Sequence, residues 1–140
     1  MKWLTWENIG IDRMACVWLI GRFIDSESQI LYVAPCTSPL VEGVEPFDIP
    51  GVRLSHRGGH SSFHTMLVEY QLDDPLLWRL AEMVDEADTA QDVLVEPAAP
   101  GLDLICRGLR LISPDDPVAA ERGCLIYDAM YAQLAADPGS

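Results

Sequence analysis

Two Asp-Pro pairs constrain the fold of this 140-residue chain more than any other local feature. Asp74-Pro75 and Asp116-Pro117 each place a good N-cap residue directly before a proline, which is favoured in the first helical turn. The first pair is followed by apolar residues at helical spacing: Leu76, Leu80, Met83, Val84 and Ala87. The pairs predict one helix that begins at residue 75 and another that runs from residue 117 to about residue 135.

Three more helices are expected from periodicity and capping. Asp12 stands at the N-cap position of a helix over residues 13–24, whose apolar face includes Cys16 and Leu19. A second begins at Ser61 or Ser62 and ends at about residue 70, and a third covers residues 102–111.

Short runs of β-forming residues predict a small sheet. Residues 3–6, 30–33 and 52–56 are the expected strands, and the prolines and glycines of residues 37–51 predict a loop with brief structure. The sequence therefore predicts a mostly helical α+β fold, with about five helices and a three-stranded sheet, in a single domain over residues 1–140.

The charge of the chain excludes several classes of partner. Its formal net charge is −13, and it contains one Lys and eight Arg. Nucleic-acid binding depends on Lys and Arg that neutralise phosphates, so direct nucleic-acid contact by this chain is not expected. Adsorption to an anionic membrane is disfavoured for the same reason.

The apolar residues are sufficient for a core but not for a membrane helix. Hydrophobic residues make up 49% of the chain, yet no apolar run reaches the roughly 20 residues that a membrane span needs. The first six residues lack the features of a signal peptide, so a cytoplasmic location is expected. The four cysteines are scattered without a CxxC pair, which argues against disulfides and thiolate zinc sites and for buried packing.

Three groups of motifs resemble the C-terminal domain of the chromate-resistance protein B family. They are residues 11–25 (IDRMACVWLIGRFID), residues 47–63 (with FDIPGV, LSHRG and SF), and residues 72–75 (LDDP), 87–89 (ADT) and 127–131 (YDAMY). The motifs occur in the family's order over nearly the whole chain. The resemblance implies a role in regulating or supporting chromate resistance. It also implies that any DNA contact belongs to an N-terminal part that the full-length family proteins carry.

The first candidate site surrounds the first predicted helix. It consists of Asp12, Arg13, Cys16 and Arg22, joined by Arg57 as a further ligand-binding residue. Guanidinium groups beside a thiol would suit chromate, a divalent oxidising oxyanion, and a helix N-terminus can lower a thiol pKa. The alternative is structural: Asp12 caps the helix, Cys16 packs in the core and Arg22 pairs with a surface carboxylate.

The second candidate site contains every histidine of the chain, namely His56, His60 and His64. Gly58-Gly59 interrupts any helix there, so a strand end, a turn and a helix start could direct the imidazoles toward one divalent metal ion. The turn and the helix N-terminus could instead hold an anion. In the structural alternative, His56 is a hydrogen-bonded buried ring and the other two are exposed.

The third group is acidic and comprises Glu86, Asp88 and Asp128. Carboxylates within apolar stripes need partners when they are buried. Ion pairs with arginines are the favoured interpretation, and the alternative is that these three carboxylates join His56 as oxygen ligands of a divalent ion.

Three functions therefore remain open. The leading hypothesis is an accessory or sensor domain of chromate or oxidative-stress resistance that binds a metal ion or a small inorganic anion. The second is a small metal-dependent enzyme that uses His56 with an aspartate. The third is an acidic module that binds a protein partner or another copy of itself.

Overall fold

The computed structural model describes residues 1–137, and over this range the chain forms five α-helices, one π-helical segment and a three-stranded sheet. The elements are β1 (Lys2–Trp6), α1 (Ile11–Leu19), η1 (Ile20–Ile24), β2 (Gln29–Val33), β3 (Val44–Pro46), α2 (Ser62–Glu69), α3 (Pro75–Asp88), α4 (Ala99–Ile112) and α5 (Asp116–Ala136). The expectation of a mostly helical α+β fold is confirmed.

All three strands run parallel, in the order β2-β1-β3. The central strand β1 pairs with β2 from Lys2↔Gln29 onward and with β3 from Lys2↔Val44 onward. The chain thus leaves β1 toward one side to form β2 and returns on the other side to form β3. In parallel sheets, such a reversal opens a crevice beyond the carboxyl ends of the strands, where ligands commonly bind.

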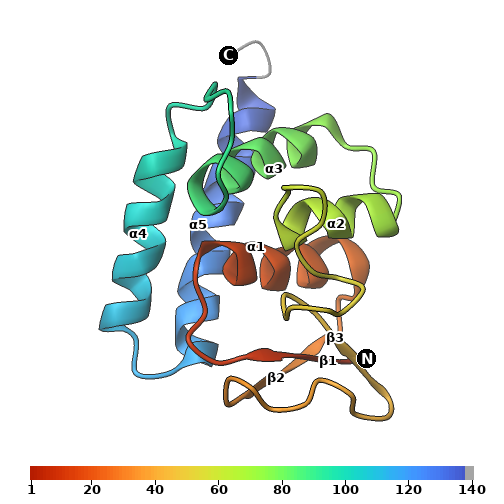
Figure 1. The fold of residues 1–140 in the computed structure, drawn as a ribbon. Helices are drawn as coiled ribbons and strands as arrows, with labels where there is room; N and C mark the ends of the chain where they lie inside the picture. Colours follow the sequence, from red (N-terminus) through yellow and green to blue (C-terminus); the bar gives the residue numbers. More distant parts are fainter. Residues whose placement is uncertain (138–140) are drawn as a thin grey trace.

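Helix α1 lies at the centre of the molecule, between the sheet and α3, with α4 at one flank (Figure 1). Its Trp18 contacts four aromatic rings, with centroids 5.5 Å from Phe23, 6.4 Å from Phe63 and 5.8 Å from both Tyr127 and Tyr131. Tyr127 is fully buried on α5 and donates its hydroxyl hydrogen to the carbonyl oxygen of Ile11 at 3.0 Å. Burial of these large rings holds α1 in place, and α1 in turn positions the polar residues at its N-terminus.

The capping signals of α2, α3 and α5 were informative to within one residue. Asp74 caps α3 by accepting from the backbone N–H of Leu76, as predicted, and Ser61 caps α2. The cap of α5 is Asp115, and the prediction of Asp116 was wrong. Asp116 occupies the first turn of α5, where its carboxylate accepts from the backbone N–H groups of Asn8 and Ile9.

Asp12 is also not an N-cap, which corrects the prediction for the first helix. Gly10 occupies that position without a side-chain cap, and Asp12 lies within the first turn with its carboxylate directed at α2. The α-helix ends at Leu19, because the backbone of η1 changes to the wider π-helical pattern, in which Asp25 N–H bonds to the carbonyl of Ile20.

The third strand was placed wrongly. Residues 52–56 contain one isolated bridge, between Leu54 and Phe47, and otherwise form local turn hydrogen bonds such as Val52 N–H to the carbonyl of Ile49. The third strand of the sheet is β3, which pairs with β1 on the side away from β2 and lies within the segment expected to be a loop. Helix α4 also begins three residues before its predicted start, at Ala99.

The cysteines of the described residues are all free thiols. Cys16 and Cys106 are buried as expected, Cys124 is half-buried, and Cys36 is exposed. Within residues 1–137, no helix combines the length and apolar character needed to cross a membrane.

Candidate functional site

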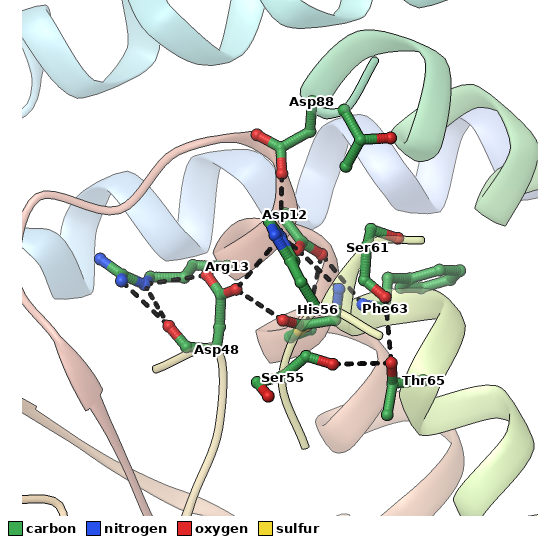
Figure 2. Close-up of polar contacts among 12 residues, drawn as sticks. Asp12, Arg13, Asp48, Ser55, His56, Ser61, Phe63, Thr65 and Asp88 are labelled. Carbon is green, nitrogen blue, oxygen red and sulfur yellow. Dashed lines mark hydrogen bonds and ion pairs between the residues drawn. The ribbon is translucent and has the colours of Figure 1, made fainter. Parts of the chain in front are cut away.

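A cleft of about 590 Å³ opens beyond the carboxyl ends of β1 and β3. Five parts of the chain supply its charged residues: the start of α1, the segment after β3, the segment before α2, the end of α3, and α4. The charged and histidine side chains that line it are Asp12, Arg13, Asp48, His56, Asp88 and Arg110. Figure 2 shows Asp12, Asp48 and Asp88 grouped around the ring of His56.

Asp12 connects α1 to the N-terminus of α2. Its carboxylate is buried and accepts from the backbone N–H of Ser62 at 2.8 Å and from that of Phe63 at 3.0 Å. N–H groups in the first turn of a helix have no partner within the helix, and the helix dipole there favours a negative charge. Asp12 therefore completes the hydrogen bonding of α2 from a separate helix.

Asp48 lies two residues after β3 and has a left-handed backbone conformation, with φ of 51°. Aspartate tolerates this region better than most residues. Its carboxylate accepts from the hydroxyl of Ser62 at 2.6 Å and pairs with Arg13 Nε at 2.9 Å. Burial, together with the negative charge of Asp12, raises the pKa of Asp48 to about 8.

Arg13 joins the two strand ends. Its guanidinium donates to the backbone carbonyls of Asp48, Trp6 and Glu7 at 3.0 to 3.3 Å, in addition to its pairing with the Asp48 carboxylate. These contacts use donors on all three nitrogens of the side chain. Arg13 consequently serves mainly to hold the rim of the cleft.

His56 lies at the meeting point of the three carboxylates. Its Nε2 is 2.8 Å from Asp12 Oδ2, 3.2 Å from Asp88 Oδ2 and 3.8 Å from Asp48 Oδ1, while 51% of its side chain is exposed. The hydrogen bond to Asp12 raises the pKa of His56 to about 9, and the charges of all three aspartates act in the same direction. Burial and the charge of Asp12 also raise the pKa of Asp88.

The donor atoms of this cluster are close enough to hold one cation. One atom each from Asp12, Asp48 and His56 lies within 4.8 Å of the other two. Oxygen-rich sets of this kind suit hard divalent ions such as Mg²⁺ and Mn²⁺, and a single imidazole is compatible with Mn²⁺.

The thiol of Cys16 is buried and does not line the cleft. It is fully buried behind Asp12, with its Sγ 3.7 Å from Asp12 Oδ1. Burial and the negative charges of Asp12 and Asp48 raise the pKa of Cys16 well above its usual value, the opposite of the lowering considered for a helix N-terminus. The packing interpretation of this residue agrees with the structure.

The remaining arginine and aspartate candidates lie outside the cleft. Arg22 pairs with Asp128, which also accepts a hydrogen bond from Trp18 Nε1, and this agrees with the structural ion pair favoured for these residues. Arg57 pairs with Glu69 at 3.0 Å.

His60 and His64 form a second group, separate from His56. His60 Nδ1 is 2.6 Å from the buried Asp85, and the rings of His60 and His64 are stacked at 3.8 Å. Burial and the neighbouring His60 lower the pKa of His64. The three histidines therefore belong to two clusters and do not meet at a single one.

Sequence reasoning missed Asp48, Asp85 and the backbone of Ser62. Asp48 would have been found if β3 had been recognised, because a carboxylate just after a parallel strand lies at the ligand-binding edge of the sheet. Asp85 lies among apolar residues on the buried face of α3, which is an available signal for a partnered carboxylate.

This chain is similar to known proteins over nearly its whole length. Residues 3–134 match the family described as "ChrB, C-terminal domain", and the chain belongs to that family. The protein named "Protein ChrB" from Cupriavidus metallidurans is 30% identical over 137 residues, which cover 95% of this chain and 40% of that relative. This chain therefore spans well under half the length of that relative. No solved structure matches the chain.

Proposed function

We propose that this chain binds a divalent cation in the cleft, through Asp12, Asp48, His56 and Asp88, and acts as a ligand-responsive accessory unit in chromate resistance. The observation that carries the proposal is the convergence of three aspartates on one imidazole. His56 Nε2 has a carboxylate oxygen of each aspartate within 3.8 Å.

The charge balance supports a cation over an oxyanion. Three carboxylates outnumber the two arginines, Arg13 and Arg110, that line the cleft, and the donors of Arg13 already bind Asp48 and backbone carbonyls. Arg22 and Arg57, which an oxyanion pocket would also need, are paired with Asp128 and Glu69. A chromate dianion at this position would lie against the buried carboxylate of Asp12, and like charges repel most strongly where water is partly excluded.

The bound protons support the same interpretation. The raised pKa values of Asp48 and His56 mean that the cluster retains protons near neutral pH, at Asp48 mainly because of burial and then the charge of Asp12, and at His56 mainly because of its hydrogen bond to Asp12. A divalent cation would replace those protons, so binding would release protons and strengthen as the pH rises.

A cation in this cleft would also link separate parts of the fold. Asp12 belongs to α1 and already binds the N-terminus of α2, whereas Asp88 is the last residue of α3. A metal bound to both would tie the end of α3 to α1. The link between α3 and α1 would form only when the metal is bound, so it could signal metal binding to the additional part that longer family members carry. DNA contact would belong to that additional part.

Isothermal titration calorimetry with Mn²⁺ tests the proposal. We expect Asp48→Asn and Asp88→Asn to weaken Mn²⁺ binding at least about tenfold, because each removes a charged ligand. Asp128→Asn is the matched control, since it neutralises an aspartate that pairs with Arg22 outside the cleft, and its affinity should equal that of the wild type. Equal Mn²⁺ affinity in all four proteins would contradict the proposal.

A second candidate function is metal-dependent catalysis, which the exposure of His56 favours. Half of its side chain faces a cleft whose volume lies within the roughly 300–1,000 Å³ typical of small-ligand sites. Screening of the Mn²⁺-loaded protein against ester and phosphoester substrates tests this function. Turnover that is lost in His56→Ala would support catalysis. Absence of turnover in the wild-type protein would contradict catalysis and leave cation binding as the proposed function.

A further inference from the structure

A second group of possible metal ligands lies beside the first turn of α2. It consists of His60, His64 and Asp85, with one donor atom of each within 4.8 Å of the other two. It shares no side chain with the cluster around His56. The inference drawn from it therefore does not depend on the proposed function.

Local backbone structure fixes the two histidines. Gly58 and Gly59 have φ values of 60° and 81°, and they form a tight turn in which Arg57 and His60 exchange two backbone hydrogen bonds. Glycine adopts positive φ at both positions without steric cost. His64 is the third residue of α2, and its N–H bonds to the Ser61 hydroxyl, which places it one helical turn beyond His60.

The ring contacts bring the nitrogens of the two histidines to one side. The rings are parallel to within 7°, with centroids 3.8 Å apart. The edge of His64 packs against Trp78 at 5.1 Å, and the Trp78 indole is itself anchored by a hydrogen bond to the carbonyl of Leu72. The pair is thus held between a turn and a packed aromatic side chain.

Asp85 supplies a fixed carboxylate. Its side chain is 7% exposed, its Oδ2 lies 2.6 Å from His60 Nδ1, and its Oδ1 accepts from the backbone N–H of Ser61 at 2.8 Å. The His60 side chain is 42% exposed and can adjust its position. Neighbouring ligands of a six-coordinate ion with bonds of about 2.1 Å lie roughly 3 Å apart, so a small rotation of the histidines completes the geometry.

We propose that His60, His64 and Asp85 form a site for a divalent first-row transition ion such as Zn²⁺, distinct from the oxygen-rich cluster at His56. Two imidazoles and one carboxylate are a ligand set that favours Zn²⁺, Ni²⁺, Cu²⁺ or Fe²⁺ over Mg²⁺ or Ca²⁺. The ion replaces the proton between His60 and Asp85 and joins the turn, α2 and α3.

Zn²⁺ titration by calorimetry tests this site. We expect His60→Gln and His64→Gln each to lose one Zn²⁺ relative to the wild type. The same substitution at the third histidine, His56→Gln, should retain that Zn²⁺. Unchanged Zn²⁺ stoichiometry and affinity in both His60→Gln and His64→Gln would overturn the proposal.

A measurement on the unmodified protein avoids any dependence on the folding of variants. In histidine-ring NMR spectra, one equivalent of Zn²⁺ should shift the resonances of His60 and His64, and shifts confined to His56 would overturn the site. Mn²⁺ binding measured in Asp48→Asn reports separately on the cleft. Failure of either site is therefore recognised independently of the other.

Discussion

The substitution Asp12→Asn tests the claim that the buried carboxylate of Asp12 binds the N-terminus of α2 to α1. Asp12 is 3% exposed. Its Oδ1 accepts from the Phe63 N–H, and its Oδ2 accepts from the Ser62 N–H and from His56 Nε2. Asparagine preserves the shape of the side chain but retains one acceptor oxygen and gains two N–H donors.

The expected loss of stability follows from the replacement of the carboxylate by an amide. One of the two backbone N–H groups of α2 must face the new amide NH₂, so a buried donor loses its acceptor. A hydrogen bond to a charged group contributes about 1.5–3 kcal/mol, and a buried donor left unpaired costs about 1–3 kcal/mol. These ranges describe the same lost interaction, so we expect Asp12→Asn to lower the free energy of unfolding by about 3 kcal/mol.

Urea unfolding followed by circular dichroism measures this change. With a denaturant slope of about 1.5 kcal/mol per molar, the midpoint should fall by about 2 M. The control Asp128→Asn removes a partly exposed ion pair and should change the unfolding free energy by less than about 1 kcal/mol. A loss of less than about 0.5 kcal/mol in Asp12→Asn, with unchanged amide exchange at Ser62 and Phe63, would refute this account of α2.

Two further predictions concern titration and packing. NMR titration should give His56 a pKa of about 9 and His64 a pKa below the usual 6.5; a value near 6.5 for both would contradict the site. Because folding raises the pKa of His56, its contribution to stability is present below about pH 6.5 and is lost as the pH rises through about 9. In urea unfolding, Gly108→Ala should stabilise the protein by about 0.5–1 kcal/mol, because its Cβ meets open space within helix α4. Gly123→Ala should instead destabilise the protein by about 1 kcal/mol, because the added Cβ would lie 2.9 Å from the sulfur of Met14 on α1. Equal effects of the two substitutions would contradict the packing of α5 on α1.

Local chemistry was enough to predict most helices. Asp74-Pro75 and Ser61 identify the starts of α3 and α2 because capping and proline geometry act within a few residues. The same logic misplaced Asp12 and Asp116, because each has the chemistry of a cap but accepts its hydrogen bonds from distant backbone. Sequence spacing does not distinguish a cap from such a long-range acceptor.

The third strand shows why the sheet was harder to predict. Val44–Pro46 is three residues long and contains a proline, so its β-propensity is weak. It forms a strand because it pairs with the central strand β1, and this long-range contact has no local signal.

The candidate site was predictable only in part for the same reason. Arg13 was a candidate in a separate group, and Asp88 was considered as a possible partner of His56; the structure brings all three to the same cleft. Asp48 was missed because its role depends on β3. His60 and His64 were grouped with His56 because of their spacing, but the Gly58-Gly59 turn directs His60 toward Asp85 and away from the cleft.

Paramagnetic broadening of NMR signals by Mn²⁺ tests the central claim most directly. At substoichiometric Mn²⁺, the account predicts that the His56 ring and the backbone near Asp12, Asp48 and Asp88 lose their signals first, while residues around Asp128 remain sharp. Broadening that is absent, or that spreads evenly over the acidic surface, would contradict a cation site in the cleft.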